Sequence, residues 1–223
     1  MISSYYGILI IPILLLHGYA ENSSVWNLWA NWLKADQFAN VKTVAFHNDD
    51  QCGSVQEHAL ELQAQVNNLL QVTHSDKVNI VAHSKGGLDA RWYITHNRNK
   101  VANLIMIAVP NKGTTASYIN LTPCSFSNPN GLLDLQPGSD ATRIVDRLNE
   151  THYYTVAGSN ATPCYFLTER YTCYIFASDG LVTTGSAQSN YTSLGVFPYN
   201  HSGLLTHKDI YEKILPILLG AHL

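Results

Sequence analysis

The sequence predicts an α/β fold, in which a mostly parallel central sheet of about six strands carries helices on both faces. Two observations support this prediction. Short apolar runs rich in β-forming residues alternate along the chain with longer amphipathic segments. The chain has 223 residues, of which 46% are hydrophobic and 13% charged. That composition suffices for one sizeable core, so we expect a single domain over residues 1–223.

Each element follows from a local pattern. Pro12 opens the first apolar run, at a strand position where a missing N–H is tolerated. The expected strands are residues 13–16, 41–46, 78–82, 104–109, 153–157 and, more weakly, 194–197. The expected helices are residues 25–35, 54–71, 87–96, 142–149 and 208–219. Because the apolar runs show little polar alternation, they are typical of strands buried on both faces.

The N-terminal stretch is strongly apolar, but it does not resemble a targeting segment. The first lysine is Lys34, so a basic leader region is missing, and a small-residue cleavage site is also missing. The run is shorter than a bilayer span and Pro12 interrupts it. We therefore expect a buried strand and no integral membrane span, with any secretion signal already absent from this chain.

The charge of the chain argues against some partners. The formal net charge is −3 and the pI is near 6.3, without a cluster of Lys or Arg. Nucleic acids and anionic membrane surfaces are therefore poor candidates. We expect a monomer, and contact with a lipid–water interface stays open.

The cysteines and sequons bear on localisation. Four cysteines fit disulfides in a secreted protein and reduced thiols equally well, and they allow three pairings. Cys164 and Cys173 flank a short loop-like segment and are the favoured pair. The chain also carries an excess of N-x-S/T sequons, at Asn22, Asn120, Asn149, Asn160, Asn190 and Asn200. These features favour a secreted or cell-surface protein, with a cytoplasmic location as the alternative.

One segment departs from the alternating pattern. Residues 111–138 hold three prolines and three glycines among Asn and Ser residues, which indicates a long insertion after a strand. Long loops in compact domains often form lids or binding walls. We expect residues 111–150 to form an insertion of this kind, and a surface excursion without function is the alternative.

Ser84 carries the strongest chemical signal. It follows the run at 78–82 and precedes a helix that opens at Gly86 and Gly87. A strand, a sharp turn and a helix are the setting of a nucleophile elbow, whose neighbours at two residues before and after must be small. Here these neighbours are Ala82 and Gly86. The simpler alternative, a helix-capping serine, explains neither the double glycine nor Ala82.

The sequence around these residues resembles that of the α/β-hydrolase superfamily, and in particular that of its small bacterial lipases and esterases. The matching pieces are IPILLLHGYAENSSVW, VNIVAHSKGGLDARWYI, IMIAVPNKGTT, SDGLVTTGSA and NHSGLL, in the family's order. The resemblance implies a minimal α/β-hydrolase fold with a short lid or none. It also implies hydrolysis of carboxylic esters through an acyl-enzyme.

The base that activates Ser84 should be a histidine late in the chain, because the order in this fold is Ser, acid, His. His201 lies in a loop between the last expected strand and the final helix, and its HSGLL context resembles the family's histidine motif. His207 is the rival, although its position suggests a cap or surface residue. His96 and His152 lie on or beside other elements and cannot reach back.

Asp179 is the expected acid. It lies in ASDGLV, a tight polar turn after the run at 153–157, which matches the family's acid loop and the chain order. A plain Asp-Gly turn is the alternative. In this interpretation Asp179 would orient His201 and stabilise its protonated ring.

Two backbone N–H groups should bind the oxyanion of the tetrahedral intermediate. The N–H of Lys85 follows the nucleophile, and the N–H of Tyr19 has the family's position after the His17–Gly18 pair. The Lys85 side chain, where relatives commonly have Met or Gln, would carry a charge near the cleft or reach solvent.

The substrate groove is the least determined part of the site. The Tyr19 ring would line the acyl pocket, and Leu181, Val182, Leu204 and Leu205 flank the acid and base loops. Ordinary core packing explains these four equally well.

The expected function is therefore serine-dependent hydrolysis of small-molecule or lipid esters with apolar acyl groups, without a cofactor or a metal. Acyl transfer, amide hydrolysis and cutinase-like polyester hydrolysis on the same three residues are alternatives. A hydrolase-like binding protein without catalysis is the alternative from another class.

Overall fold

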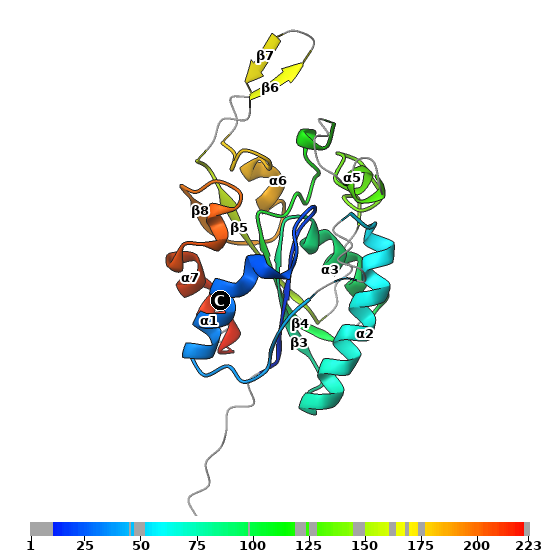
Figure 1. Cartoon of the computed structure of the whole chain (residues 1–223), viewed down its shortest axis with the longest axis vertical. Coiled ribbons are helices and arrows are strands. Elements are labelled where there is room, and N and C mark those ends of the chain that lie inside the picture. Colours follow the sequence, from blue (N-terminus) through cyan, green and yellow to red (C-terminus); the bar gives the residue numbers. More distant parts are fainter. Residues whose placement is uncertain are drawn as a thin grey trace, which may run out of the picture.

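We describe a computed structural model of the chain over residues 11–44, 46, 52–97, 99–118, 124, 129–144, 150–160, 164–167, 170–173 and 177–220. Within these residues, six strands form one all-parallel sheet in the order β2-β1-β3-β4-β5-β8 (Figure 1). Helices cover both faces of the sheet. The predicted fold class is confirmed.

The strands agree closely with the apolar runs. They are β1 (Ile13–Leu16), β2 (Val41–Thr43), β3 (Val78–His83), β4 (Val101–Ile107), β5 (His152–Gly158) and β8 (Thr192–Phe197). The side chains of β1 and β3 are buried without alternation, while the edge strand β8 has only one buried residue, Leu194. A central parallel strand is covered on both faces, which explains this difference.

The helices are α1 (Asn27–Ala35), α2 (Val55–Thr73), α3 (Lys85–His96), α5 (Asn130–Asp134), α6 (Thr184–Gln188) and α7 (Lys208–Leu218). Short 3₁₀ turns occupy Ser23–Trp26, Thr115–Tyr118 and Gly203–Leu205. Helix α2 begins with a capping box, in which the Ser54 side chain and Glu57 satisfy each other's backbone N–H groups. None of the helices within the described ranges combines the length and apolar character that crossing a bilayer requires.

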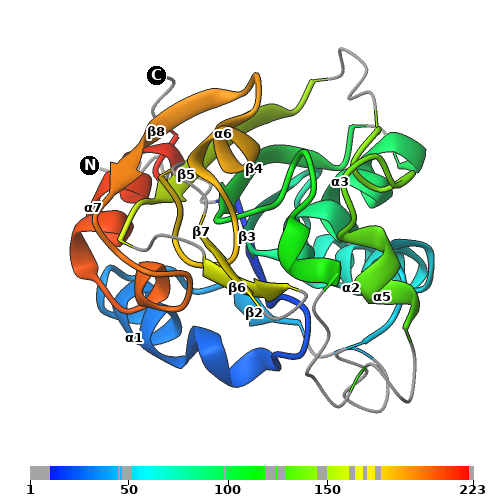
Figure 2. The same ribbon diagram turned by 90° about the horizontal axis from the view of Figure 1, so that it is seen from above.

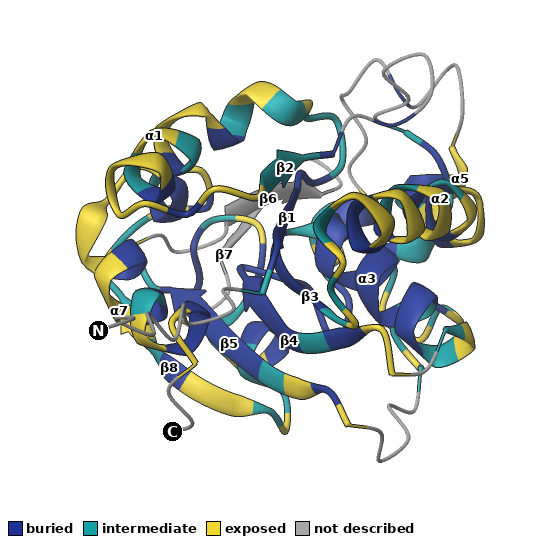
Figure 3. Ribbon diagram, turned by 90° about the horizontal axis from the view of Figure 1, so that it is seen from below, coloured by how far each residue is buried: buried dark blue, intermediate teal, exposed yellow. Residues whose placement is uncertain are grey.

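Two layers of helix enclose the sheet. Helices α2 and α3 cover one face, while α1 and α7 cover the other (Figures 2 and 3). Successive residues of β3 alternate between the two cores: Ile80 and Ala82 pack with α2 and α3, and Val81 packs with α1 and α7. Because both cores share the same strands, the carboxyl ends of these strands are held in fixed positions.

Three expectations about local structure need correction. The helix predicted at 142–149 is not helical over its described part, where residues 142–144 form a turn and a bend, and residues 145–149 lie outside the described residues. The segment expected to be loop-like between Cys164 and Cys173 contains an antiparallel hairpin, β6 (Cys164–Leu167) and β7 (Arg170–Cys173). Strand β2 ends at Thr43 rather than at residue 46.

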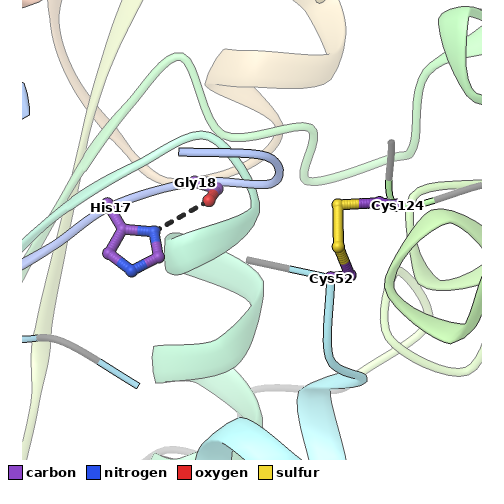
Figure 4. Close-up of a disulfide and its surroundings, with 4 residues drawn as sticks. All are labelled: His17, Gly18, Cys52 and Cys124. Carbon is purple, nitrogen blue, oxygen red and sulfur yellow. Dashed lines mark hydrogen bonds between the residues drawn. A yellow bond between two sulfur atoms is a disulfide. The ribbon is translucent and has the colours of Figure 1, made fainter. Parts of the chain in front are cut away.

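A disulfide joins Cys52 to Cys124 (Figure 4). It connects the segment before α2 to the insertion after β4, across 72 residues of sequence. In the hairpin, the backbone of Cys164 lies directly opposite that of Cys173. The favoured Cys164–Cys173 bond concerns sulfur atoms that lie outside the described part of the structure, so that pairing stays a prediction.

The start of α3 packs tightly against the segment that directly follows β4. A Cβ atom added to Gly87 would lie only 2.2 Å from a methyl carbon of Val109, which is 1% exposed. We predict that Gly87→Ala destabilises the fold by about 1–3 kcal/mol through overpacking. In urea unfolding, Gly87→Ala/Val109→Ala should lose less free energy than the two single variants together, because truncating Val109 makes room for the new methyl. If the double variant instead loses the sum of the two single losses in free energy of unfolding, Gly87 and Val109 are not in tight contact.

Candidate active site

Ser84 occupies a strained turn between β3 and α3. Its backbone has φ 51° and ψ −130°, a region that residues with a side chain rarely adopt. Ser84 stands at the N-cap position of α3, but its side chain makes no capping hydrogen bond. The hydroxyl is therefore left for another role, and the capping alternative receives no support.

Glycines allow the main chain to close around this turn. A Cβ at Gly86 would lie 2.3 Å from the carbonyl oxygen of His17, and a Cβ at Gly18 would lie 2.7 Å from the Cβ of Ser84. The end of β1 and the start of α3 thus touch through bare backbone. Gly86 must be small mainly because of β1, rather than because of Ala82 across the turn.

The structure brings His201 and Asp179 together. The Nδ1–H of His201 donates to Oδ2 of Asp179 at 2.8 Å, and the backbone N–H of His201 donates to the Asp179 carbonyl at 2.9 Å. Because a carboxylate only accepts hydrogen bonds, the proton of the neutral ring lies on Nδ1. Nε2 is then available as a proton acceptor.

Asp179 is fixed by its own loop. Its Oδ1 accepts the backbone N–H groups of Leu181, at 2.9 Å, and Val182, at 2.7 Å. A Cβ at Gly158, the last residue of β5, would lie 2.7 Å from the Cβ of Asp179. The missing side chain at Gly158 therefore leaves room for the acid loop, and the carboxylate has little freedom to turn away from His201.

Ser84 and His201 line one cavity of about 230 Å³. Apolar side chains make up most of its wall, and the insertion after β4 contributes many of them. The lining residues are Tyr19, Ala20, Glu21, Ser84, Pro110, Thr114, Ala116, Ser117, Leu132, Leu135, Leu181, Val182, His201 and Ser202. The predicted groove residues Tyr19, Leu181 and Val182 are among them.

Leu204 and Leu205 lie elsewhere, which corrects their expected place in the groove. Both are buried in the core formed with α1 and α7, and the Leu205 carbonyl accepts the indole N–H of Trp29 at 2.9 Å. The two leucines follow the His201 loop in the sequence because they pack in the core, and they do not line the groove. The rival base His207 stands at the N-cap position of α7 without a side-chain capping bond, is exposed and stacks on Tyr199.

The insertion forms a wall that is anchored at several points. The Thr114 N–H donates to the Leu135 carbonyl at 2.8 Å, and the Thr114 hydroxyl donates to the carbonyl of Leu181 on the acid loop. Asp134 accepts the N–H of Val55 at 2.7 Å, next to the Cys52–Cys124 disulfide. These contacts tie the described part of the insertion to α2 and to the acid loop.

The two expected oxyanion donors border the nucleophile. Lys85 follows Ser84 at the first position of α3, and Tyr19 belongs to the turn that touches Ser84 through Gly18. His17 lies behind this turn, where its Nδ1–H donates to the Gly18 carbonyl at 2.9 Å (Figure 4). Burial lowers the pKa of His17, so the ring is neutral near pH 7.

The Lys85 side chain neither faces the cleft nor reaches solvent, which corrects both expectations for it. It is fully buried, and its Nζ lies 2.5 Å from Oδ1 of Asp89 and 3.3 Å from Nδ1 of His58. Burial raises the pKa of Asp89, but the charge of Lys85 and the contacts with His58 outweigh it and lower the pKa. The buried ion pair lies within α3, and its contacts with His58 of α2 anchor the helix that carries the Lys85 N–H.

Sequence reasoning missed Glu21 and His83. Oε2 of Glu21 accepts the Gly18 N–H at 2.7 Å and the Nδ1–H of His83 at 2.9 Å. Burial opposes ionisation of Glu21, yet the charge and hydrogen bond of His83 and the Gly18 N–H lower its pKa to about 2. The turn that follows β1, here called the first strand turn, contains Gly18. The signal available in the sequence was the carboxylate of Glu21, three residues after Gly18.

A parallel sheet with a strained serine after its central strand, and an Asp–His pair at the same edge, defines an α/β-hydrolase. The chain belongs to the palmitoyl protein thioesterase family, whose family model matches residues 12–181.

Individual relatives agree with this fold. Triacylglycerol lipase 2 of Saccharomyces cerevisiae is 27% identical over 174 residues, which are 74% of this chain and 45% of the relative. A triacylglycerol lipase of Pseudarthrobacter phenanthrenivorans is 29% identical over 111 residues, 46% of this chain and 34% of the relative. The chain thus spans less than half the length of these curated relatives.

Among solved structures, the mature Bacillus licheniformis lipase BlEst2 superposes with a TM-score of 0.73. The identity is 20%, and the match covers 94% of this chain and 92% of that one. At this level of identity the likeness concerns the fold alone.

The buried pair under the nucleophile gives a stability prediction. Lys85→Met should destabilise the protein by about 3–5 kcal/mol, because it leaves Asp89 buried without its cation. Lys85→Met/Asp89→Asn should recover part of this loss, since the amide can still accept from His58. Urea unfolding measures both losses.

The exposed Lys208–Glu212 pair has the same i,i+4 spacing and serves as a control. Lys208→Met should change stability little, because exposed pairs are screened by solvent. Equal losses for Lys85→Met and Lys208→Met would show that the buried pair does not anchor α3.

The lowered pKa of Glu21 predicts how stability depends on pH. Its folded pKa of about 2 lies below the usual value of 4.5 for a free glutamate, so its contribution of about 3 kcal/mol is present above the unfolded pKa and is lost as pH falls through the folded pKa. The stability advantage of the wild type over Glu21→Gln should therefore shrink between about pH 5 and pH 2. If urea unfolding shows the same difference in free energy between the wild type and Glu21→Gln at every pH, the lowered pKa of Glu21 is contradicted.

Proposed function

We propose that the protein is a serine hydrolase that cleaves carboxylic esters with apolar acyl groups through an acyl-enzyme. The observation that carries this proposal is the shared cavity of Ser84 and His201, with the His201 ring oriented by Asp179. The family membership and the printed names of the curated relatives, triacylglycerol lipases, support it.

The steps follow from the positions of these groups. His201 Nε2 takes the proton of Ser84 as Oγ attacks the ester carbonyl, and Asp179 stabilises the resulting imidazolium. The N–H groups of Tyr19 and Lys85 donate to the oxyanion. The protonated ring then gives its proton to the leaving alcohol, and water repeats the sequence on the acyl-enzyme.

The wall of the cavity supports an apolar acyl group. Tyr19, Leu132, Leu135, Leu181 and Val182 contribute most of its bulky side chains. Apolar contacts of this kind favour the acyl chain of a substrate over a charged acid. Residues 111–150 would then serve as the acyl wall, with or without movement as a lid.

Thioester hydrolysis is a second candidate, which the family model favours. The same nucleophile, base and oxyanion donors attack a thioester carbonyl, and only the leaving group differs. Rates on matched acyl esters and acyl thioesters distinguish the two. Acyl transfer and amide hydrolysis would show in the same panel with acceptor alcohols and amides.

We also propose where the protein is located and what surface it contacts. The Cys52–Cys124 disulfide, together with the sequons, supports a secreted or cell-surface protein, because such bonds persist in oxidising compartments. The exposed rings and leucines Tyr118, Leu133 and Leu181 support contact with lipid substrates.

We predict that Ser84→Ala lowers kcat on p-nitrophenyl esters by about 10⁴-fold or more while the protein stays folded. Ser202→Ala is the matched control, because Ser202 lines the same cavity without standing on the elbow. It should keep kcat within a few-fold of the wild type. Near-normal activity of Ser84→Ala would defeat the assignment.

A further inference from the structure

A chain of polar contacts connects the two loops that flank Ser84. Glu21 Oε2 accepts the N–H of Gly18 at 2.7 Å and the Nδ1–H of His83 at 2.9 Å. On the other side of the ring, the Nε2–H of His83 donates to the carbonyl of His201 at 3.2 Å. The imidazole of His83, the residue immediately before Ser84, therefore joins the first strand turn to the loop that carries His201.

The Glu21 carboxylate lies close to the reacting centre. The position of a Cβ on Gly18 would be 2.7 Å from Ser84 Cβ and 2.9 Å from Glu21 Oε2, so both atoms lie within 3 Å of one point. Glu21 also lines the cavity. A lone negative charge here would oppose the negative charge that develops on the substrate oxygen.

His83 can compensate that charge. Both of its ring nitrogens face acceptors, a carboxylate and a carbonyl, and a neutral imidazole has only one N–H to donate. The protonated ring satisfies both contacts. Burial acts to lower the pKa of His83, but the charge and hydrogen bond of Glu21 and the His201 carbonyl raise it above its usual value.

We propose that Glu21, at the cavity wall, and the buried His83 form an ion pair that positions both flanking loops of Ser84 and cancels the negative charge of Glu21 at the oxyanion. The inference rests on the proposed ester hydrolysis and deepens it. Both are positioning residues, because they act through Gly18, Tyr19 and His201 rather than on the substrate.

The two contacts have separate structural consequences. Anchoring the Gly18 N–H fixes the peptide that precedes the Tyr19 donor. Anchoring the His201 carbonyl adds to the bond between the His201 N–H and the Asp179 carbonyl, so the backbone of His201 is held on both sides. The His83 and His201 rings lie 4.6 Å apart between centroids, which leaves little space for the base to shift.

A double-mutant cycle tests the charge of the pair. His83→Asn keeps a donor near the Nδ1 position but removes the cation, and Glu21→Gln removes the anion with little change in shape. His83→Asn should lower kcat for p-nitrophenyl butyrate by about 100-fold, because the carboxylate is then uncompensated. Glu21→Gln should lower kcat by about 10-fold, because a neutral His83 keeps only one of its two contacts.

The decisive result is the double variant. Glu21→Gln/His83→Asn should have a kcat about 10-fold above that of His83→Asn, with KM within a few-fold of the wild type throughout. A role in packing alone predicts that the double variant is no faster than His83→Asn, and that result would overturn the proposal. If His83→Asn does not fold, an unchanged kcat of Glu21→Gln would overturn it equally.

Two controls make the outcome specific. Glu150→Gln removes the anion of the exposed Lys77–Glu150 pair and should leave kcat unchanged. Ser84→Ala in the same assay separates the two proposals. A wild-type rate that does not depend on Ser84 defeats the proposed function, whereas a Ser84-dependent rate without rescue in the double variant defeats only the ion pair.

Discussion

The contact of bare main chain between the end of β1 and the start of α3 is the constraint on which the site depends. A single added carbon at Gly86 would meet the His17 carbonyl at 2.3 Å. This approach places the first strand turn beside the nucleophile, at the sharp turn where Ser84 has a positive φ. Strain of this kind costs about 1–3 kcal/mol, and it persists because β3 is fully buried between two cores.

Charge around the nucleophile is arranged in compensated pairs. Lys85 and Asp89 pair one turn apart on α3, and Glu21, just after the first strand turn, pairs with His83 at the end of β3. Each pair holds main chain that borders Ser84 in place, and each pair adds no net charge near the nucleophile. Asp179 differs from both, because two backbone N–H groups and His201 share its carboxylate. A base that must gain a proton during the reaction benefits from such a partner.

Local patterns in the sequence predicted the sheet well, because strands buried on both faces need apolar residues at nearly every position. The same patterns predicted that Asp179 and His201 follow strands that end at one edge, and the structure brings the two together at 2.8 Å. Helix 142–149 had an amphipathic pattern, yet its described start is a turn. Short amphipathic segments carry little information when packing rather than propensity decides.

What the sequence did not predict depends on contacts between distant segments. The ring of His83 meets Glu21 across 62 residues, and a strand residue before the serine gives no sign of that partner. Leu204 and Leu205 flank the base loop in sequence, but the 3₁₀ turn Gly203–Leu205 directs them into the core. The Cys52–Cys124 disulfide joins segments 72 residues apart, and four cysteines alone do not determine their pairing.

Labelling with a fluorophosphonate probe, followed by peptide mapping, tests most directly whether the hydroxyl at the strained turn is an activated nucleophile. The account predicts a single label on the peptide that contains Ser84, which disappears after heat denaturation and forms far more slowly in His201→Asn. Labelling that is absent from the native protein, or that is equally fast without the His201 ring, would contradict it.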